Sequence, residues 1–161
     1  MSKTTITLPS FGLTDPGADK ELFFDDSAGA LALQNAGKIG QVLSDTKTDT
    51  ASISSSTFAA ISGLSQAITP SSSSSKILCI VQLNLGNDST NLYARLMRDT
   101  TSIFQSDSAS NRPQATYGYT SSGQYAMNPS PIVYLDSPST TSAITYSIYW
   151  RSDGSTTGYI N

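Results

Sequence analysis

The sequence is poor in charge, and this excludes one large class of partners. Only 13 % of the 161 residues are charged, about half the ~25 % of an ordinary soluble domain. Nine Lys and Arg against twelve Asp and Glu leave a net charge of −3. Binding to nucleic acid requires a basic surface that can pair with phosphates. We therefore expect no nucleic-acid partner.

The residues of common active sites and metal sites are also scarce. The chain has no His, a single Glu (Glu21) and a single Cys (Cys79). This excludes a Ser-His-Asp triad, His ligands, a Cys-rich zinc site and an intrachain disulfide. Cys79 lies in an apolar run, which indicates a buried thiol rather than a reactive one. Aspartates in turns are expected to bond nearby backbone rather than calcium. The sequence predicts no metal, no cofactor and no enzyme activity.

Long hydrophobic runs are missing as well. No stretch of 18 apolar residues occurs, so we expect no membrane insertion. No apolar segment follows Met1, so we expect no signal peptide.

Small hydroxyl side chains take the place of the missing charges. Ser occurs 29 times and Thr 19 times. Thr, Ile and Tyr, which favour strands, are common, whereas Glu, Lys, Arg and Met, which favour helices, are scarce. Short apolar stretches alternate with polar turns along the chain. This pattern predicts an all-β protein, either a β-sandwich or a jelly roll.

The pattern of apolar residues predicts where the strands lie. We expect strands at 39–43, 58–69, 76–85, 92–98, 103–105, 130–136, 143–151 and 157–160. In the clearest of them Ile144, Tyr146, Ile148 and Trp150 share one face. Between 92 and 98, Leu92, Ala94 and Leu96 share one face, and Tyr93, Arg95 and Met97 share the other. The five serines at 71–75 predict a surface loop, with a flexible linker as the alternative.

The first 36 residues differ from the remainder. Two short apolar runs, 22–25 and 30–34, flank a turn that contains Gly29, which predicts a β-hairpin. An isolated hairpin is only marginally stable in water, so this one is expected to dock on the main domain or on another chain. The candidate anchoring residues are Phe11, Leu13, Phe23 and Phe24. We expect an attachment segment at 1–36 and a β-sandwich head at 37–161.

The best candidate for a binding loop lies at 117–128. Tyr117, Tyr119, Tyr125 and Asn128 stand there among Ser and Gly residues. Binding loops use this composition, because Tyr gives a large contact area and Asn gives adaptable hydrogen bonds. The loop could therefore stack on sugar rings. Alternatively, Tyr117 and Tyr119 lie on a strand and pack inside the sandwich or between subunits.

Three segments of the chain resemble a known family. They are Ile-Thr-Pro-Ser-Ser-Ser-Ser-Ser-Lys-Ile-Leu at 68–78, Ala-Arg-Leu-Met-Arg-Asp-Thr-Thr-Ser-Ile at 94–103, and Tyr-Leu-Asp-Ser-Pro-Ser-Thr-Thr-Ser-Ala-Ile-Thr-Tyr at 134–146. Together they resemble a virion-protein domain of marine bacteriophages, cyanophages among them. The resemblance covers roughly residues 38–160. Members of that family continue past the position of Asn161 with a further strand, so the resemblance leaves the C-terminal topology open.

The resemblance implies a non-enzymatic structural protein of a phage tail fibre or head fibre. It implies a jelly-roll-like β-sandwich head and a homotrimer whose N-terminal segment attaches to other virion proteins, of the capsid shell or of the tail and baseplate. The head would then bind polysaccharide or protein on the host surface, and the chain would be located in the virion. One alternative is a capsid decoration or cement protein without receptor binding. Another is a stand-alone carbohydrate-binding module.

Overall fold

The computed structural model describes residues 20–25, 30–35, 39–88, 90–120, 126–154 and 156–161. The chain divides into two compact units, Met1–Val42 and Leu43–Asn161. The division falls six residues beyond the boundary expected from the sequence. In the first unit, β1 (Lys20–Asp25) pairs with β2 (Ala30–Asn35) as an antiparallel hairpin. The expected hairpin is therefore confirmed.

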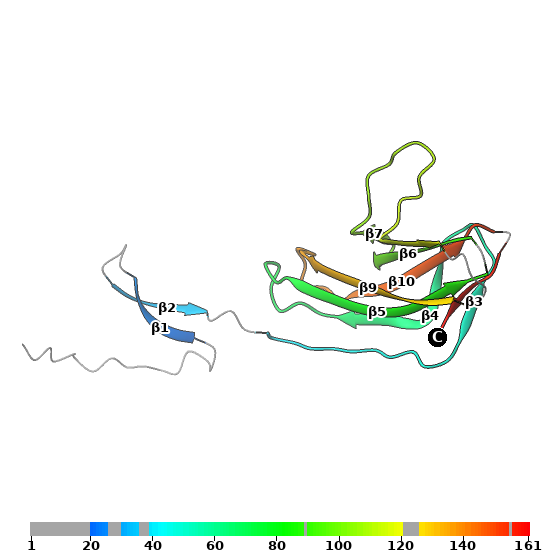
Figure 1. Cartoon of the computed structure of the whole chain (residues 1–161). Coiled ribbons are helices and arrows are strands. Elements are labelled where there is room, and N and C mark those ends of the chain that lie inside the picture. The colour runs from blue at the N-terminus through cyan, green and yellow to red at the C-terminus, as the bar shows by residue number, and fades with distance from the viewer. Residues whose placement is uncertain (1–19, 26–29, 36–38, 89, 121–125, 155) are drawn as a thin grey trace, which may run out of the picture. The chain divides into compact units, whose positions relative to one another are not determined.

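Two antiparallel sheets make up the second unit (Figure 1). The four-stranded sheet has the order β3 (Ala51–Ile53), β11 (Gly158–Ile160), β5 (Ile77–Asn87) and β9 (Ala126–Asp136). The five-stranded sheet has the order β4 (Ala59–Ile68), β10 (Ile144–Ser152), β6 (Asn91–Arg98) and β7 (Thr101–Ile103). Its fifth strand, β8 (Tyr117–Thr120), pairs with β6 beside Asn91–Ala94, whereas β7 pairs beside Leu96–Arg98. Figure 1 shows the loop between β7 and β8 standing out from the sandwich.

The strand order is that of a jelly roll. Consecutive strands alternate between the sheets except for β6, β7 and β8, which share the five-stranded sheet, and the orders β3-β11-β5-β9 and β4-β10-β6-β8 interleave. The described residues contain no helix. The predicted all-β, jelly-roll-like class is therefore confirmed. The last strand, β11, pairs with β3 on one side and β5 on the other.

The core lies between the sheets and follows the alternation seen in the sequence. The residues expected on the inner face of β10 are all buried, as are those expected on the inner face of β6: Ile144, Tyr146, Ile148 and Trp150, and Leu92, Ala94 and Leu96. Cys79 is buried on β5, as expected. Gly63 adopts a φ of +80° in β4, close to the point where the register with β10 shifts. A side chain at this position would strain the backbone.

One expected strand is absent. Residues 39–43 form no ladder, and Ile39 and Val42 are more than three-quarters exposed. The prediction was wrong because an apolar run becomes a strand only where another strand offers its hydrogen-bonding edge. The serine run at 71–75 is a loop between β4 and β5, as expected.

Candidate functional site

The outer faces of the two sheets differ in chemistry. Alternation directs one set of side chains on each strand into the core and the other set outward. The outward set of β5 and β9 is aliphatic and uncharged over much of its length, whereas that of β6 and β10 includes arginines and aromatic rings. Because both inner sets are mainly apolar, the clearest difference between the sheets lies on the surface.

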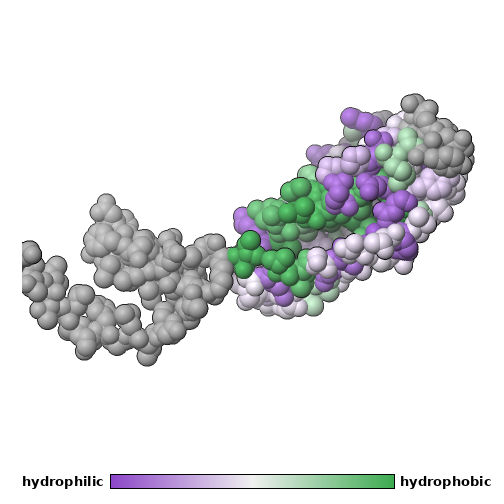
Figure 2. Space-filling model, turned by 60° about the horizontal axis from the view of Figure 1, so that its bottom comes forward, coloured by the Kyte–Doolittle hydropathy of each residue, from purple (hydrophilic) through white to green (hydrophobic). Residues whose placement is uncertain are grey.

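Four side chains form what we call the aliphatic face. The ladder between β5 and β9 places Leu78 opposite Leu135 and Ile80 opposite Val133. Their exposed fractions are 57 % for Leu78, 52 % for Leu135, 71 % for Ile80 and 59 % for Val133. Farther along the ladder the outward pairs are Gln82–Pro131 and Asn84–Pro129, which add no charge. Figure 2 shows hydrophobic surface gathered on this side of the sandwich.

Five residues form what we call the arginine–aromatic cluster. Pairing of β6 with β10 sets Tyr93 opposite Arg151 and Arg95 opposite Tyr149, and Phe58 directly precedes β4. The guanidinium carbon of Arg95 lies 3.8 Å from the centroid of the Phe58 ring. That of Arg151 lies 5.4 Å from the same centroid and 4.8 Å from the centroid of Tyr93. Each arginine therefore packs against an aromatic ring, a favourable cation–π arrangement.

Backbone carbonyls hold both guanidinium groups in place. Arg95 donates from Nε to the carbonyl oxygen of Gln114 over 2.7 Å, and Arg151 donates from Nη1 to that of Ser56 over 2.9 Å. Neither arginine forms an ion pair with the residues that the structure describes. Partial burial lowers the pKa of Arg95, and repulsion from Arg151 lowers it further. Among the described residues, the cluster thus holds two neighbouring positive charges without an ion pair, and the nearest acidic influence on it is that of Asp153 on Tyr93.

The tyrosines proposed as a binding loop lie beside this cluster. Tyr117 pairs with Ala94 and Tyr119 with Leu92, both core positions of β6, and Tyr117 packs against the core. Gly118 lies between them opposite Tyr93, on the outer side of the sheet. A Cβ at residue 118 would approach Cδ1 of Tyr93 to 3.3 Å, so the glycine leaves room for the Tyr93 ring. Glycine, rather than tyrosine, borders the cluster here.

The other predicted site residues are dispersed. Asn128 is half-buried on β9 opposite Leu85, on the other sheet from Tyr117. Tyr125, Phe11 and Leu13 lie outside the described residues. Phe23 and Phe24 belong to β1, where the backbone pairing alone is described. The roles proposed for these residues remain predictions.

Period-two spacing predicts that Tyr93 and Arg95 share one face of their strand, but it assigns neither residue a role. Arg151 follows Trp150 at the end of the most regular strand, and alternation alone would have placed it outward. The available signal was the recurrence of Arg and Tyr on the outer positions of two strands. The partner strand of β6 was not known from the sequence.

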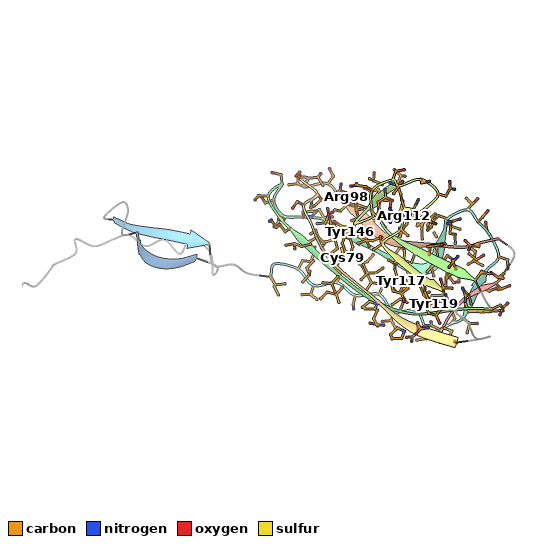
Figure 3. All side chains as sticks on the ribbon, turned by 45° about the horizontal axis from the view of Figure 1, so that its top comes forward. Cys79, Arg98, Arg112, Tyr117, Tyr119 and Tyr146 are labelled. Atoms are coloured by element: carbon orange, nitrogen blue, oxygen red, sulfur yellow. The ribbon has the colours of Figure 1, made fainter. Side chains whose placement is uncertain are left out.

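A buried polar network joins the two sheets. Asp136 of β9 is 4 % exposed and accepts a hydrogen bond of 2.6 Å from the hydroxyl of Tyr146 on β10. It also pairs with Nη1 of Arg98 on β6, at 2.9 Å and 2.8 Å for its two oxygens. Figure 3 labels Arg98 and Tyr146 together with Cys79. Because every charged group in the network has a partner, we interpret it as a tie between the sheets.

The pKa values in this region argue against chemistry at Cys79 or Tyr146. Burial, followed by the nearby Asp136 carboxylate, raises the pKa of Cys79 to about 11. A thiol with so high a pKa carries little thiolate at neutral pH. Burial and the hydrogen bond to Asp136 also raise the pKa of Tyr146.

Of the described loop aspartates, Asp45 accepts a hydrogen bond from adjacent backbone, as expected for turns, whereas the other partners are side chains or lie farther along the chain. Asp45 accepts hydrogen bonds from the backbone N–H groups of Thr46 and Ser65, at 2.9 and 3.2 Å. Asp49 pairs with Lys47, and Asp88 accepts from the Tyr159 hydroxyl at 3.1 Å. The described residues include no group of three or more His, Cys, Asp or Glu suited to a metal ion. Over the same residues, no helix is both long enough and apolar enough to cross a membrane.

No protein-family description fits this chain, and no curated protein is significantly similar to it.

Proposed function

We propose that this chain is a non-enzymatic structural protein of a phage particle, in a tail fibre or a head fibre. Residues 1–36 attach it to other virion proteins, and the jelly-roll head assembles as a homotrimer that contacts glycan or protein on the host surface. The resemblance of three segments to marine-phage appendage domains supports this proposal. Among the structural observations, the aliphatic face gives this proposal its main support.

The aliphatic face fits further copies of this chain. Its four side chains are adjacent, uncharged and each more than half exposed, which is unusual on a hydroxyl-rich surface. Covering the exposed part of each is worth ~1–2 kcal/mol, so the four contribute ~4–8 kcal/mol per copy. A micromolar association needs about 8 kcal/mol. A face without charge has no means to select a charged partner, whereas it can pack against identical aliphatic faces around an axis.

The test compares the oligomeric state of the wild-type chain with that of Ile80→Glu. Ile80 is the most exposed of the four residues, so a charge there leaves the core intact but prevents burial of the face. The control is Ser62→Glu, an equal charge at an exposed position of β4. Size-exclusion chromatography with light scattering should give a trimer for the wild type and the control, and a monomer for Ile80→Glu.

The same measurement separates the alternatives. A well-folded wild-type monomer at micromolar concentration would overturn the proposed assembly and favour a stand-alone carbohydrate-binding module. A trimer that persists in Ile80→Glu would show that the copies meet elsewhere. Immunogold labelling of particles that carry the chain should mark fibre tips. Labelling spread evenly over the shell would favour the capsid decoration protein instead.

A further inference from the structure

The arginine–aromatic cluster is a charged surface feature that the proposed assembly leaves unused. It lies on the five-stranded sheet, whereas the aliphatic face lies on the four-stranded sheet. Assembly through the aliphatic face therefore does not require the surface that carries Arg95 and Arg151. The chain has only nine basic residues, and two of them lie next to each other on this surface.

Placing two guanidinium groups side by side is unfavourable unless a negative group joins them. Both guanidinium carbons lie within 5.4 Å of the centroid of one ring, that of Phe58. Coulomb repulsion at such separations is weakened by solvent but persists at a half-buried site. The pairing of Arg98 with Asp136 shows the alternative arrangement, in which the charge is neutralised within the fold. The charges of Arg95 and Arg151 remain available for a ligand.

The geometry also prepares these arginines to bind. The rings of Phe58 and Tyr93 pack against the guanidinium groups of Arg95 and Arg151, and the carbonyls of Gln114 and Ser56 each accept one N–H. The two Nη groups of Arg95 keep their N–H donors free of partners among the described residues. Nη2 of Arg151 likewise has no hydrogen-bond partner among the described residues, whereas its Nε is buried beyond the reach of a ligand. Donors fixed in advance lose little conformational entropy when an oxyanion binds.

We infer that Arg95 and Arg151 bind the carboxylate or sulfate group of an acidic sugar in the host-surface glycan. This inference rests on the proposed attachment function, because that function supplies the glycan. A planar guanidinium fork matches a carboxylate or sulfate with two parallel hydrogen bonds. The outward neighbours on β10, Thr145, Ser147 and Tyr149, are hydroxyl residues that suit the hydroxyl groups of a sugar. The net charge of −3 disfavours a nucleic acid, whose binding would require a wider basic surface.

The test uses calorimetric titration of the full chain with defined polymers. Oligogalacturonate presents carboxylates, dextran sulfate presents sulfates, and neutral dextran presents neither. We expect the wild type to bind at least one acidic polymer, more weakly at higher salt, and to ignore neutral dextran. The acidic polymer that binds more tightly identifies the anionic group that the site recognises.

Variants connect the binding to the cluster. Arg95→Gln and Arg151→Gln should each lower the affinity for the acidic polymer ~10-fold or more, because each removes charge-assisted hydrogen bonds. Arg112→Gln is the matched control, since it removes an exposed arginine of the loop between β7 and β8 and should bind as the wild type does. Arg95→Lys and Arg151→Lys keep the charge but lose the fork, and should give intermediate affinities. Circular dichroism and light scattering on the same samples verify the fold and the oligomeric state.

Several results would overturn the inference. One is a wild type that binds neither acidic polymer, and another is Gln variants that bind as tightly as Arg112→Gln. Equal, arginine-dependent binding of duplex DNA or polyglutamate would indicate an unselective charged patch. If a trimeric chain gave these results, the proposed sugar site would be wrong and the proposed assembly would be retained. If a monomeric chain bound the acidic polymer, the proposed assembly would be wrong and the sugar site would be retained.

Discussion

The outer faces of the four-stranded and five-stranded sheets rest on the same interior but differ in chemistry. Ile80 and Val133 form an uncharged aliphatic pair on one, and Arg95 and Arg151 place two positive charges on the other. Strand alternation determines which residues face the core, and the core requires apolar residues from both sheets. The outer positions carry no such requirement. Their chemistry can therefore differ between the sheets, and the two faces suit different partners.

The largest expected effect comes from breaking the tie that holds the two sheets together. Asp136→Ala leaves the guanidinium of Arg98 and the hydroxyl of Tyr146 without their shared acceptor. We expect the free energy of unfolding to fall by about 3 kcal/mol, measured by urea denaturation. Oligomerisation and binding of the acidic polymer should weaken together, because both faces depend on the alignment of the sheets. Asp107→Ala, which removes an exposed carboxylate of the loop between β7 and β8, is the control and should leave the urea midpoint unchanged. A midpoint for Asp136→Ala that equals this control would show that the network does not join the sheets.

The next effect depends on pH and belongs to the strand that supports Arg151. The pKa of Tyr146 is raised in the folded chain above its ordinary value of about 10, so the folded state favours the protonated phenol. The contribution of Tyr146 to the free energy of unfolding is fully present below pH 10. It declines as the pH rises above 10, because the phenol of the unfolded chain loses its proton at a lower pH than that of the folded chain. Tyr146→Phe should cost ~1–2 kcal/mol at pH 7. The difference from the wild type should shrink between pH 10 and 11, in denaturation curves recorded across that range. A constant difference would contradict the assignment.

A smaller effect is confined to one face. Phe58→Leu keeps an apolar side chain but removes the ring beneath Arg95 and beside Arg151. Because an exposed cation–π contact is worth ~0.5–1 kcal/mol, binding of the acidic polymer should weaken ~2- to 5-fold while the oligomeric state is retained. Phe104→Leu is the control, since its ring stacks on Tyr134 rather than on an arginine. Equal affinities of the two variants, measured by the same titration, would show that the ring does not position the arginines.

The smallest expected effect tests whether Tyr93, at the edge of the cluster, only supports Arg151 or contacts the ligand itself. In Gly118→Ala the new Cβ lies 3.3 Å from Tyr93 Cδ1, so the ring that supports Arg151 has to shift by a few tenths of an ångström. We expect acidic-polymer affinity to change less than ~2-fold and the free energy of unfolding less than about 1 kcal/mol. Gly40→Ala, whose Cβ would meet no atom within 4 Å, should have no effect in the same titration. A change above tenfold for Gly118→Ala would mean that Tyr93 contacts the ligand directly.

The strand pattern was predictable from the sequence, and the partners of each strand were not. Ile144, Tyr146, Ile148 and Trp150 are buried together because period-two spacing is a local property of the chain. The role proposed for Tyr117 depended instead on which side of β8 it occupies. Pairing with Ala94 directs its ring toward the core, and that register is set by a strand more than twenty residues away.

By itself, the sequence determined the all-β class, the hairpin at the N-terminus and the burial of Cys79, because composition, turn residues and spacing act locally. Tertiary structure decided that residues 39–43 form no strand and that Leu78 and Leu135 become one exposed surface. It also decided that Phe58, Arg95 and Arg151 meet. These outcomes follow from cross-strand pairing between distant segments. The aliphatic face and the arginine–aromatic cluster exist only after the jelly roll has closed.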